Sequence, residues 1–83
     1  EVTLTDRTEI DFDKKGNWTE VDCKKNAVPA ALIPASVKDY VKANFPNEII
    51  TKIERKSTGI EVELANDFSL KFNKKGQFVS LDD

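Results

Sequence analysis

The feature that most constrains the fold of this chain is a repeat of its first segment near its end. Residues 1–23 align with residues 61–83 without a gap, at a constant offset of sixty residues. The copies share the heptapeptides FDKKGNW at 12–18 and FNKKGQF at 72–78, and their apolar positions coincide along the whole segment. A gapless match of this length predicts a duplicated structural unit and indicates a tandem-repeat origin.

Within the second copy, apolar residues alternate with polar ones, which is the pattern of a strand with one buried face. Residues 60–64 and 68–72 alternate in this way, and a third strand over 79–81 follows a turn at 73–76. The first copy shows the same order more weakly, and residues 49–56 predict one further strand. Short turns join the strands, so we expect each strand to pair antiparallel with the next one.

Between the copies, the apolar period changes to that of a helix. Apolar residues fall at helical spacing from Ile33 to Phe45, so one stripe faces a core. Pro34 suits the first turn of a helix, and Pro46 marks its end because a residue before proline leaves the helical region. The sequence therefore predicts an α+β fold with one main helix, about 34–45, packed on one face of a meandering antiparallel sheet.

The repeat divides the predicted domain unequally. Residues 29–82 hold a complete unit of one helix and four strands. Residues 1–23 hold three strands of an equivalent unit, without its helix and first strand. No linker rich in glycine, serine or proline separates the two parts, so we treat residues 1–83 as a single domain.

Composition argues against several classes of function. The chain has no histidine, so it lacks the commonest general base and the commonest zinc ligand. Its net charge of −2 contains no basic excess, and no apolar run approaches the roughly 20 residues of a membrane span. We therefore expect no nucleic-acid partner, no membrane insertion and no enzyme activity, although carboxylate-only chemistry stays open. The only cysteine, Cys23, is expected to be a small buried hydrophobe.

The repeated loop resembles two kinds of ligand site, and it matches neither. Residues 11–16 resemble the start of a calcium loop, but Lys15 takes a ligand position and the twelfth position holds Asp22 instead of glutamate. A phosphate loop would need more than one glycine and a following helix. A hairpin turn explains the repeat better, because Gly16 and Gly76 supply the positive φ that closes it. We predict no metal and no cofactor.

Two aromatic residues follow the repeated turn at the same place in both copies. Simple alternation places Trp18 and Phe78 on the sheet face opposite the helix, together with Glu61, Glu63 and Lys71. An exposed aromatic residue among charges is a typical recognition anchor, so these five residues form the candidate protein-binding face. The alternative, which we favour for the two rings, is that each covers its own hairpin or fills the core through a bulge.

The chain also resembles a known family, on motifs that run through nearly all of its length. The motifs are Val-Pro at 28–29, a helix ending in Phe-Pro at 45–46, the strand residues Ile50, Ile53 and Glu54, the GIEVEL stretch at 59–64 and the Phe-[Asp/Asn]-x-x-Gly hairpins. They resemble the PepSY-like, beta-lactamase-inhibitor-protein-like domains of periplasmic proteins from Bacteroidetes. The resemblance implies a helix on an antiparallel sheet and a periplasmic or secreted protein. Family members are proposed to bind or inhibit other proteins.

Two functions follow as hypotheses. The first is a non-enzymatic exported module that binds an unidentified protein partner through the sheet face opposite the helix. Its narrower form is an inhibitor of a periplasmic or secreted enzyme. The second is a structural or assembly module that forms a homodimer. Three N-terminal strands without their own helix would leave an apolar face uncovered, and edge strands pair readily.

Overall fold

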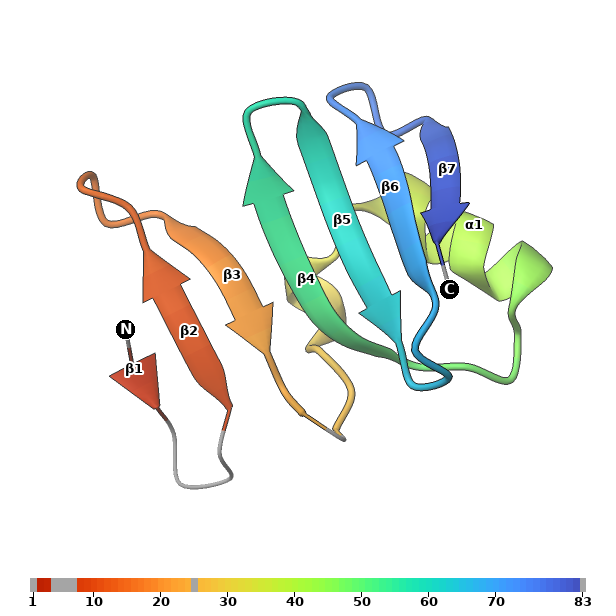
Figure 1. Ribbon diagram of the computed structural model, residues 1–83, viewed down its shortest axis with the longest axis horizontal. Coiled ribbons are helices and arrows are strands. Elements are labelled where there is room, and N and C mark those ends of the chain that lie inside the picture. The colour runs from red at the N-terminus through yellow and green to blue at the C-terminus, as the bar shows by residue number, and fades with distance from the viewer. Residues whose placement is uncertain (1, 4–7, 25, 83) are drawn as a thin grey trace.

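The computed structural model of the chain describes residues 2–3, 8–24 and 26–82. Within these residues, seven strands form one antiparallel meander in chain order, and a helix lies between the third and fourth strands (Figure 1). The α+β class and the helix are therefore confirmed. The strands are β1 (Val2–Thr3), β2 (Glu9–Phe12), β3 (Trp18–Asp22), β4 (Ile50–Lys56), β5 (Gly59–Leu64), β6 (Ser69–Asn73) and β7 (Phe78–Asp82), and the helical segments are a 3-10 turn η1 (Ala30–Leu32) and the helix α1 (Ala35–Asn44).

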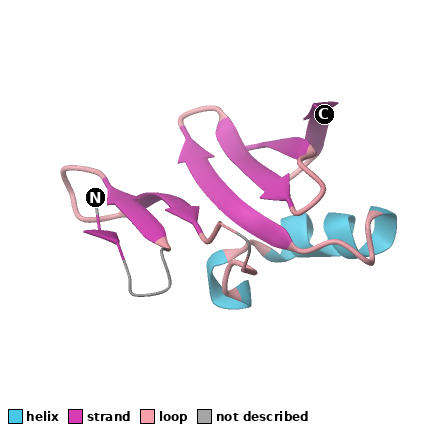
Figure 2. Cartoon of the chain, turned by 60° about the horizontal axis from the view of Figure 1, so that its bottom comes forward, coloured by secondary structure: helices cyan, strands magenta, loops and turns pink. Residues whose placement is uncertain are grey.

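Prolines set the two ends of α1. Pro34 precedes the helix with a φ of −57°, and Phe45 leaves the helical region with a φ of −137° just before Pro46. Val37 and Val41 are buried one turn apart, which orients the apolar stripe of α1 toward the sheet. Figure 2 shows that η1 lies on the same side of the sheet as α1.

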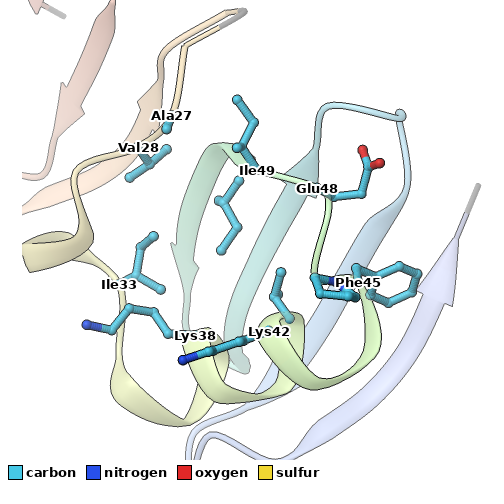
Figure 3. A pocket seen from close by; sticks show the side chains of 11 residues that line it. Ala27, Val28, Ile33, Lys38, Lys42, Phe45, Glu48 and Ile49 are labelled. Carbon is cyan, nitrogen blue, oxygen red and sulfur yellow. The ribbon is translucent and has the colours of Figure 1, made fainter.

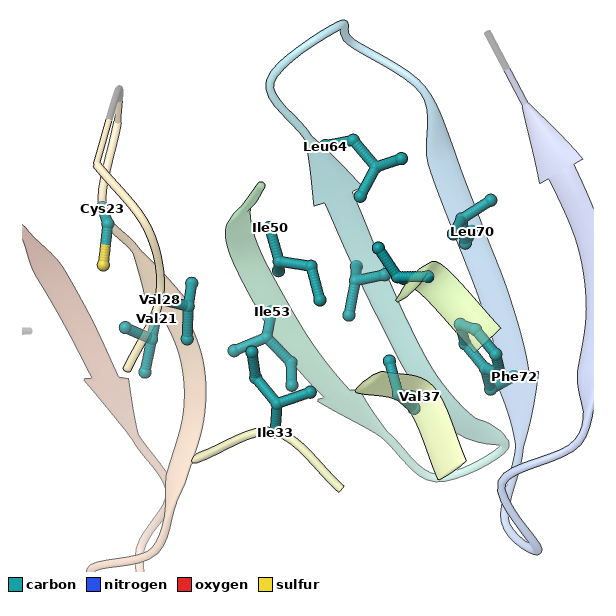
Figure 4. Packing of buried hydrophobic residues seen from close by; sticks show 12 residues of the cluster. Val21, Cys23, Val28, Ile33, Val37, Ile50, Ile53, Leu64, Leu70 and Phe72 are labelled. Carbon is teal, nitrogen blue, oxygen red and sulfur yellow. The ribbon is translucent and has the colours of Figure 1, made fainter. Parts of the chain in front are cut away.

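The core lies between that side of the sheet and the helical segments (Figure 4). Strand pairing sets Ile53 of β4 between Val21 of β3 and Val62 of β5, and it sets Val62 opposite Leu70 of β6. Ile53, Val62 and Leu70 are all completely buried, so this apolar row is the centre of the core. Cys23 is buried with a free thiol, as expected for a single cysteine that behaves as a small hydrophobe.

The hairpins β2–β3 and β6–β7, which lie sixty residues apart, close with the same geometry. In the first loop, Asp13 Oδ1 accepts hydrogen bonds from the amides two and four residues on, at 2.8 and 3.0 Å. Asn73 Oδ1 accepts the equivalent pair at 2.9 and 3.0 Å. Gly16 and Gly76 follow with φ of 86° and 82°. The repeated loop is thus a hairpin turn, while its tandem-repeat origin stays a prediction.

A register shift in both hairpins corrects the predicted position of the two aromatic rings. The shift comes just before Phe12 in the first hairpin and just before Phe72 in the second, so Trp18 pairs with Phe12 and Phe78 pairs with Phe72. One extra residue in a strand moves the following side chains to the other face. Phe72 is buried on the helix side, so the placement of Trp18 and Phe78 on the opposite face is wrong. The register shifts agree with the favoured alternative, in which a bulge turns each ring to the helix side.

Candidate functional site

The sheet face turned away from both helical segments, which we call the open face, carries charged and polar side chains. It is the upper side of the sheet in Figure 2. Residues that pair across neighbouring strands point to the same face, so the strand register identifies its members. Its carboxylates are Glu9, Asp11, Glu20, Asp22, Glu54, Glu61, Glu63 and Asp82, and its lysines are Lys52, Lys56 and Lys71.

Four of these carboxylates stand opposite one another across four adjacent strands. Asp11 of β2 pairs with Glu20 of β3, Glu20 pairs with Glu54 of β4, and Glu54 pairs with Glu61 of β5. Directly opposite residues have Cβ atoms only about 5 Å apart, and like charges in this position repel. We call these four residues the acidic row. The arrangement would be stabilised by a cation brought to the face.

Lysines of the same face neutralise part of the acidic row. Lys56 Nζ lies 2.6 Å from a carboxylate oxygen of Glu61 and 3.9 Å from one of Glu54. The hydrogen bond to Glu61 raises the pKa of Lys56. Lys52 Nζ lies 3.9 Å from Glu20. These pairs are solvent-accessible, so each contributes little to stability, and carboxylates still outnumber lysines on the face.

The environment of Glu20 combines partial burial with the charges of its neighbours. Burial within the row is the first reason that the pKa of the Glu20 carboxyl is raised above its ordinary value of 4.5. Lys52 lowers this pKa, while the negative charges of Glu54, Asp11 and Asp22 raise it further. The folded state therefore favours the protonated, uncharged form of this carboxyl.

Replacing Glu20 with glutamine is expected to stabilise the protein at neutral pH. Well below pH 4.5, the carboxyl is protonated in both the folded and the unfolded state. As the pH rises through the raised folded pKa, ionisation costs the folded state more than the unfolded state. Glu20→Gln removes this cost, so we expect its free energy of unfolding at pH 7 to rise by roughly 0.2–1 kcal/mol. The gain should vanish near pH 3 in urea denaturation followed by circular dichroism.

Glu63→Gln is the matched control for this change. Glu63 lies on the same face but stands opposite Lys52 and Ser69, so no carboxylate repels it across a strand. We expect no gain from this variant at pH 7. An equal gain in both variants, or a gain in Glu20→Gln that persists at acid pH, would contradict the like-charge account.

The structure brings together only part of the predicted binding face. Glu61, Glu63 and Lys71 all lie on the open face, where Glu61 pairs directly with Lys71 across β5 and β6. Lys71 also forms an ion pair with Asp82 of β7, at 3.3 Å. The sequence analysis missed the other members of the acidic row. Part of their signal was present, because Asp11 lies between the apolar residues Ile10 and Phe12 of its strand.

Trp18 and Phe78 lie on the helix side, and each ring has a definite neighbour there. Phe78 stacks on Tyr40 of α1 with ring centroids 4.5 Å apart and planes 8° apart. Arg55 places its guanidinium 4.0 Å from the centre of the Trp18 ring. The same guanidinium donates two hydrogen bonds to the Trp18 carbonyl oxygen, at 3.0 and 2.6 Å. These rings therefore cannot belong to an interface on the open face.

A groove between α1 and the start of β4 is a second candidate for a binding site (Figure 3). Its volume is about 240 Å³, and Ile33, Val41, Phe45 and Ile49 supply much of its apolar wall. Lys38 and Lys42 of α1 also line it. Ligand pockets usually enclose about 300–1,000 Å³ and bury most of their ligand. This groove is smaller and open to solvent, which makes the open face the better candidate site.

In residues 2–3, 8–24 and 26–82, no cluster of three or more histidine, cysteine, aspartate or glutamate side chains could hold a metal ion. The carboxylates of the acidic row instead extend along the sheet, from one strand to the next. The same part of the chain contains no helix long and apolar enough to cross a membrane.

Comparison with known proteins identifies relatives by sequence and by structure. No curated protein matches the chain. A "putative calcium-regulated periplasmic protein" from Bacteroides thetaiotaomicron is 45% identical, with a TM-score of 0.95. A "putative periplasmic protein of unknown function" from Bacteroides vulgatus is 40% identical, with the same TM-score. A second Bacteroides vulgatus protein, from the DUF2874 family, is 41% identical with a TM-score of 0.93.

The matches cover nearly all of this chain but only part of each relative. Each of the three structures matches 99% of this chain, whereas the chain covers 65% of each relative, slightly less than two thirds of its length. A family model described as "Putative beta-lactamase-inhibitor-like, PepSY-like" matches residues 1–80. The chain therefore belongs to the PepSY-like family.

Proposed function

We propose that the protein is an exported, non-enzymatic module that binds another protein through its open face. The observation that carries this proposal is the acidic row, in which carboxylates on four adjacent strands stand directly opposite one another. Opposed like charges lower the stability of a sheet. Their concentration on one exposed face is accounted for if a partner supplies the missing positive charge.

The chemistry of the open face indicates the kind of partner. A sheet face rich in carboxylates fits a protein surface rich in lysine or arginine, because each cation would lie between two negative charges. The summed field of such a face also accelerates association with a basic partner. The charges are partly screened by salt, over about 8–10 Å at physiological ionic strength, so binding should weaken as salt is added.

The relatives support the cellular location and a narrower form of the proposal. The three solved relatives are described as periplasmic proteins, which supports an exported protein. The family description names a likeness to beta-lactamase inhibitors, which supports inhibition of a periplasmic or secreted enzyme as the consequence of binding. The open face, opposite the helix, is the surface that we assign to this contact.

Charge reversal on the open face tests the proposal. We expect the immobilised wild-type protein to capture a set of basic periplasmic proteins. The control variant Asp39→Lys, which reverses one charge on the exposed side of α1, should capture the same set. Glu54→Lys and Glu61→Lys should each lose most of this capture, and the wild type should lose it in high salt. Unchanged capture by both open-face variants at low salt would remove the support for this face.

Self-association is the second candidate, and exposed apolar residues favour it. Phe12 is 48% exposed, and Val79 and Leu81 of the edge strand β7 are exposed as well. Edge strands with apolar side chains pair readily with other chains. In this case, sedimentation equilibrium should show a dimer whose population rises with concentration. A strict monomer at high protein concentration would rule this candidate out.

A further inference from the structure

The groove between α1 and the start of β4 has apolar walls and two lysines of α1, Lys38 and Lys42, at one edge (Figure 3). We propose that this groove binds a small-molecule carboxylate whose apolar part has the size of one aromatic ring or a short alkyl chain. The apolar part would lie in the groove, and the carboxylate would lie between the two ammonium groups. The groove is on the helix side of the sheet, so the site is separate from the open face and independent of the protein contact proposed there.

The walls of the groove can shield an apolar ligand from water. Val28, Ile33, Val41 and Ile50 line the groove, and the fold already buries them. Ile49 also lines it but is 42% exposed, so a large apolar side chain stays in contact with water here. A ligand that covered Ile49 would remove this surface from water, and such removal is the main favourable contribution to the binding of apolar groups.

The volume of the groove sets the size of the apolar part. The groove measures about 240 Å³. An apolar protein cavity of about 150 Å³ is large enough to bind benzene, whereas drug-sized ligands occupy pockets of about 300–1,000 Å³. The groove therefore accepts one ring with a short linker, or an alkyl chain of similar size.

Two lysines at one edge of the groove specify the charge of the ligand. Lys38 and Lys42 are four residues apart in α1, so they are neighbours on one side of the helix, where like charges repel. Figure 3 shows both side chains pointing to the same side, with Glu48 on the opposite side of the groove. Neither lysine forms an ion pair with any described residue. A carboxylate between them would relieve the repulsion and accept charge-assisted hydrogen bonds from both.

The main chain beside the groove favours a free small molecule over a peptide. A peptide that adds to a sheet gains its affinity from main-chain hydrogen bonds. The carbonyl oxygens of Ile49 and Ile50 already accept hydrogen bonds from the amides of Ala65 and Val28, at 3.0 and 2.7 Å. A small carboxylate does not depend on such groups, because lysine and apolar side chains supply its contacts.

Titration of the protein with 3-phenylpropanoate, followed by heteronuclear NMR, tests the proposal. We expect saturable shifts of the amides around the groove, and binding of the uncharged analogue 3-phenylpropan-1-ol that is weaker by about fivefold. The double variant Lys38→Glu/Lys42→Glu should bind the acid about tenfold more weakly than the wild type and the alcohol equally well. The control Lys14→Glu/Lys15→Glu, with the same change of net charge at the exposed loop tip, should bind both compounds as the wild type does.

Two further variants test the apolar part of the site and guard against unfolding. Ile49→Ser should weaken the binding of the acid and of the alcohol several-fold, whereas Val79→Ser, at an exposed residue of β7, should change neither. Circular dichroism checks that each variant is folded. If the double charge reversal unfolds the protein, Lys38→Gln/Lys42→Gln removes the two charges without reversing them, and the acid should then bind no better than the alcohol.

Four results would overturn the proposal. They are an absence of saturable binding, equal affinity of the wild type for the acid and the alcohol, acid binding that is unchanged when the charges of Lys38 and Lys42 are removed or reversed, and shifts confined to the amides of the open face. Tighter binding of a short peptide that ends in phenylalanine than of 3-phenylpropanoate would assign the groove to the end of a protein chain, and it would also overturn the proposal.

Discussion

Replacing Gly59 with alanine is expected to destabilise the protein strongly. Gly59 begins β5 with a φ of 148°, which side-chain-bearing residues rarely adopt. An added Cβ atom would lie 1.9 Å from the carbonyl oxygen of Phe72 and 2.8 Å from the Cα atom of Asn73. Both obstacles are backbone atoms of the paired strand β6, so β5 and β6 would have to separate.

We expect Gly59→Ala to lower the free energy of unfolding by about 4 kcal/mol or more, which is at the upper end for single substitutions. The total free energy of unfolding of a domain of this size is roughly 4–12 kcal/mol. Urea denaturation followed by circular dichroism measures this loss. Gly16→Ala is the matched control: its φ is also positive, but no atom lies within 4 Å of an added Cβ, so the expected loss is about 1–2 kcal/mol. Equal losses in the two variants would contradict the close approach of β6.

Replacing Ile53 with alanine is expected to cost about 2–5 kcal/mol, because it leaves a cavity at the centre of the core. Ile53 is completely buried and lies between Val21 and Val62 in the sheet, where the neighbouring strands hold the cavity open. Thermal and urea unfolding both measure the loss. Val79→Ala removes apolar atoms from a residue that is 60% exposed, so its expected change is within about 0.5 kcal/mol. A loss below 1 kcal/mol for Ile53→Ala would contradict the position of the core.

Local patterns were enough to predict the elements of the fold. The helical spacing of Val37 and Val41, limited by Pro34 and Pro46, predicted α1 to within one residue at each end. Alternation predicted the strands of both hairpins, because a strand with one covered face must place its apolar residues two apart. These features depend on near neighbours in the sequence, which is why the sequence shows them directly.

The position of the two aromatic rings depended on a feature that alternation does not reveal. A bulge adds one residue to a strand, and nothing in the local pattern near Phe78 indicates which residue is the extra one. The acidic row could not be predicted for a different reason. Its members were visible as polar positions of separate strands, but their opposition depends on the register between β3 and β4, which are separated by α1 in the chain.

Carboxyl footprinting tests the central claim, that the open face is the binding surface, most directly. Carboxylates are labelled with carbodiimide and glycine ethyl ester, with and without the captured partner, and the labels are assigned by mass spectrometry. We predict that the partner protects Glu20, Glu54 and Glu61, while Asp39 on the exposed side of α1 is labelled equally in both samples. Unchanged labelling of the three open-face glutamates in the presence of bound partner, or protection of Asp39 in their place, would contradict the account.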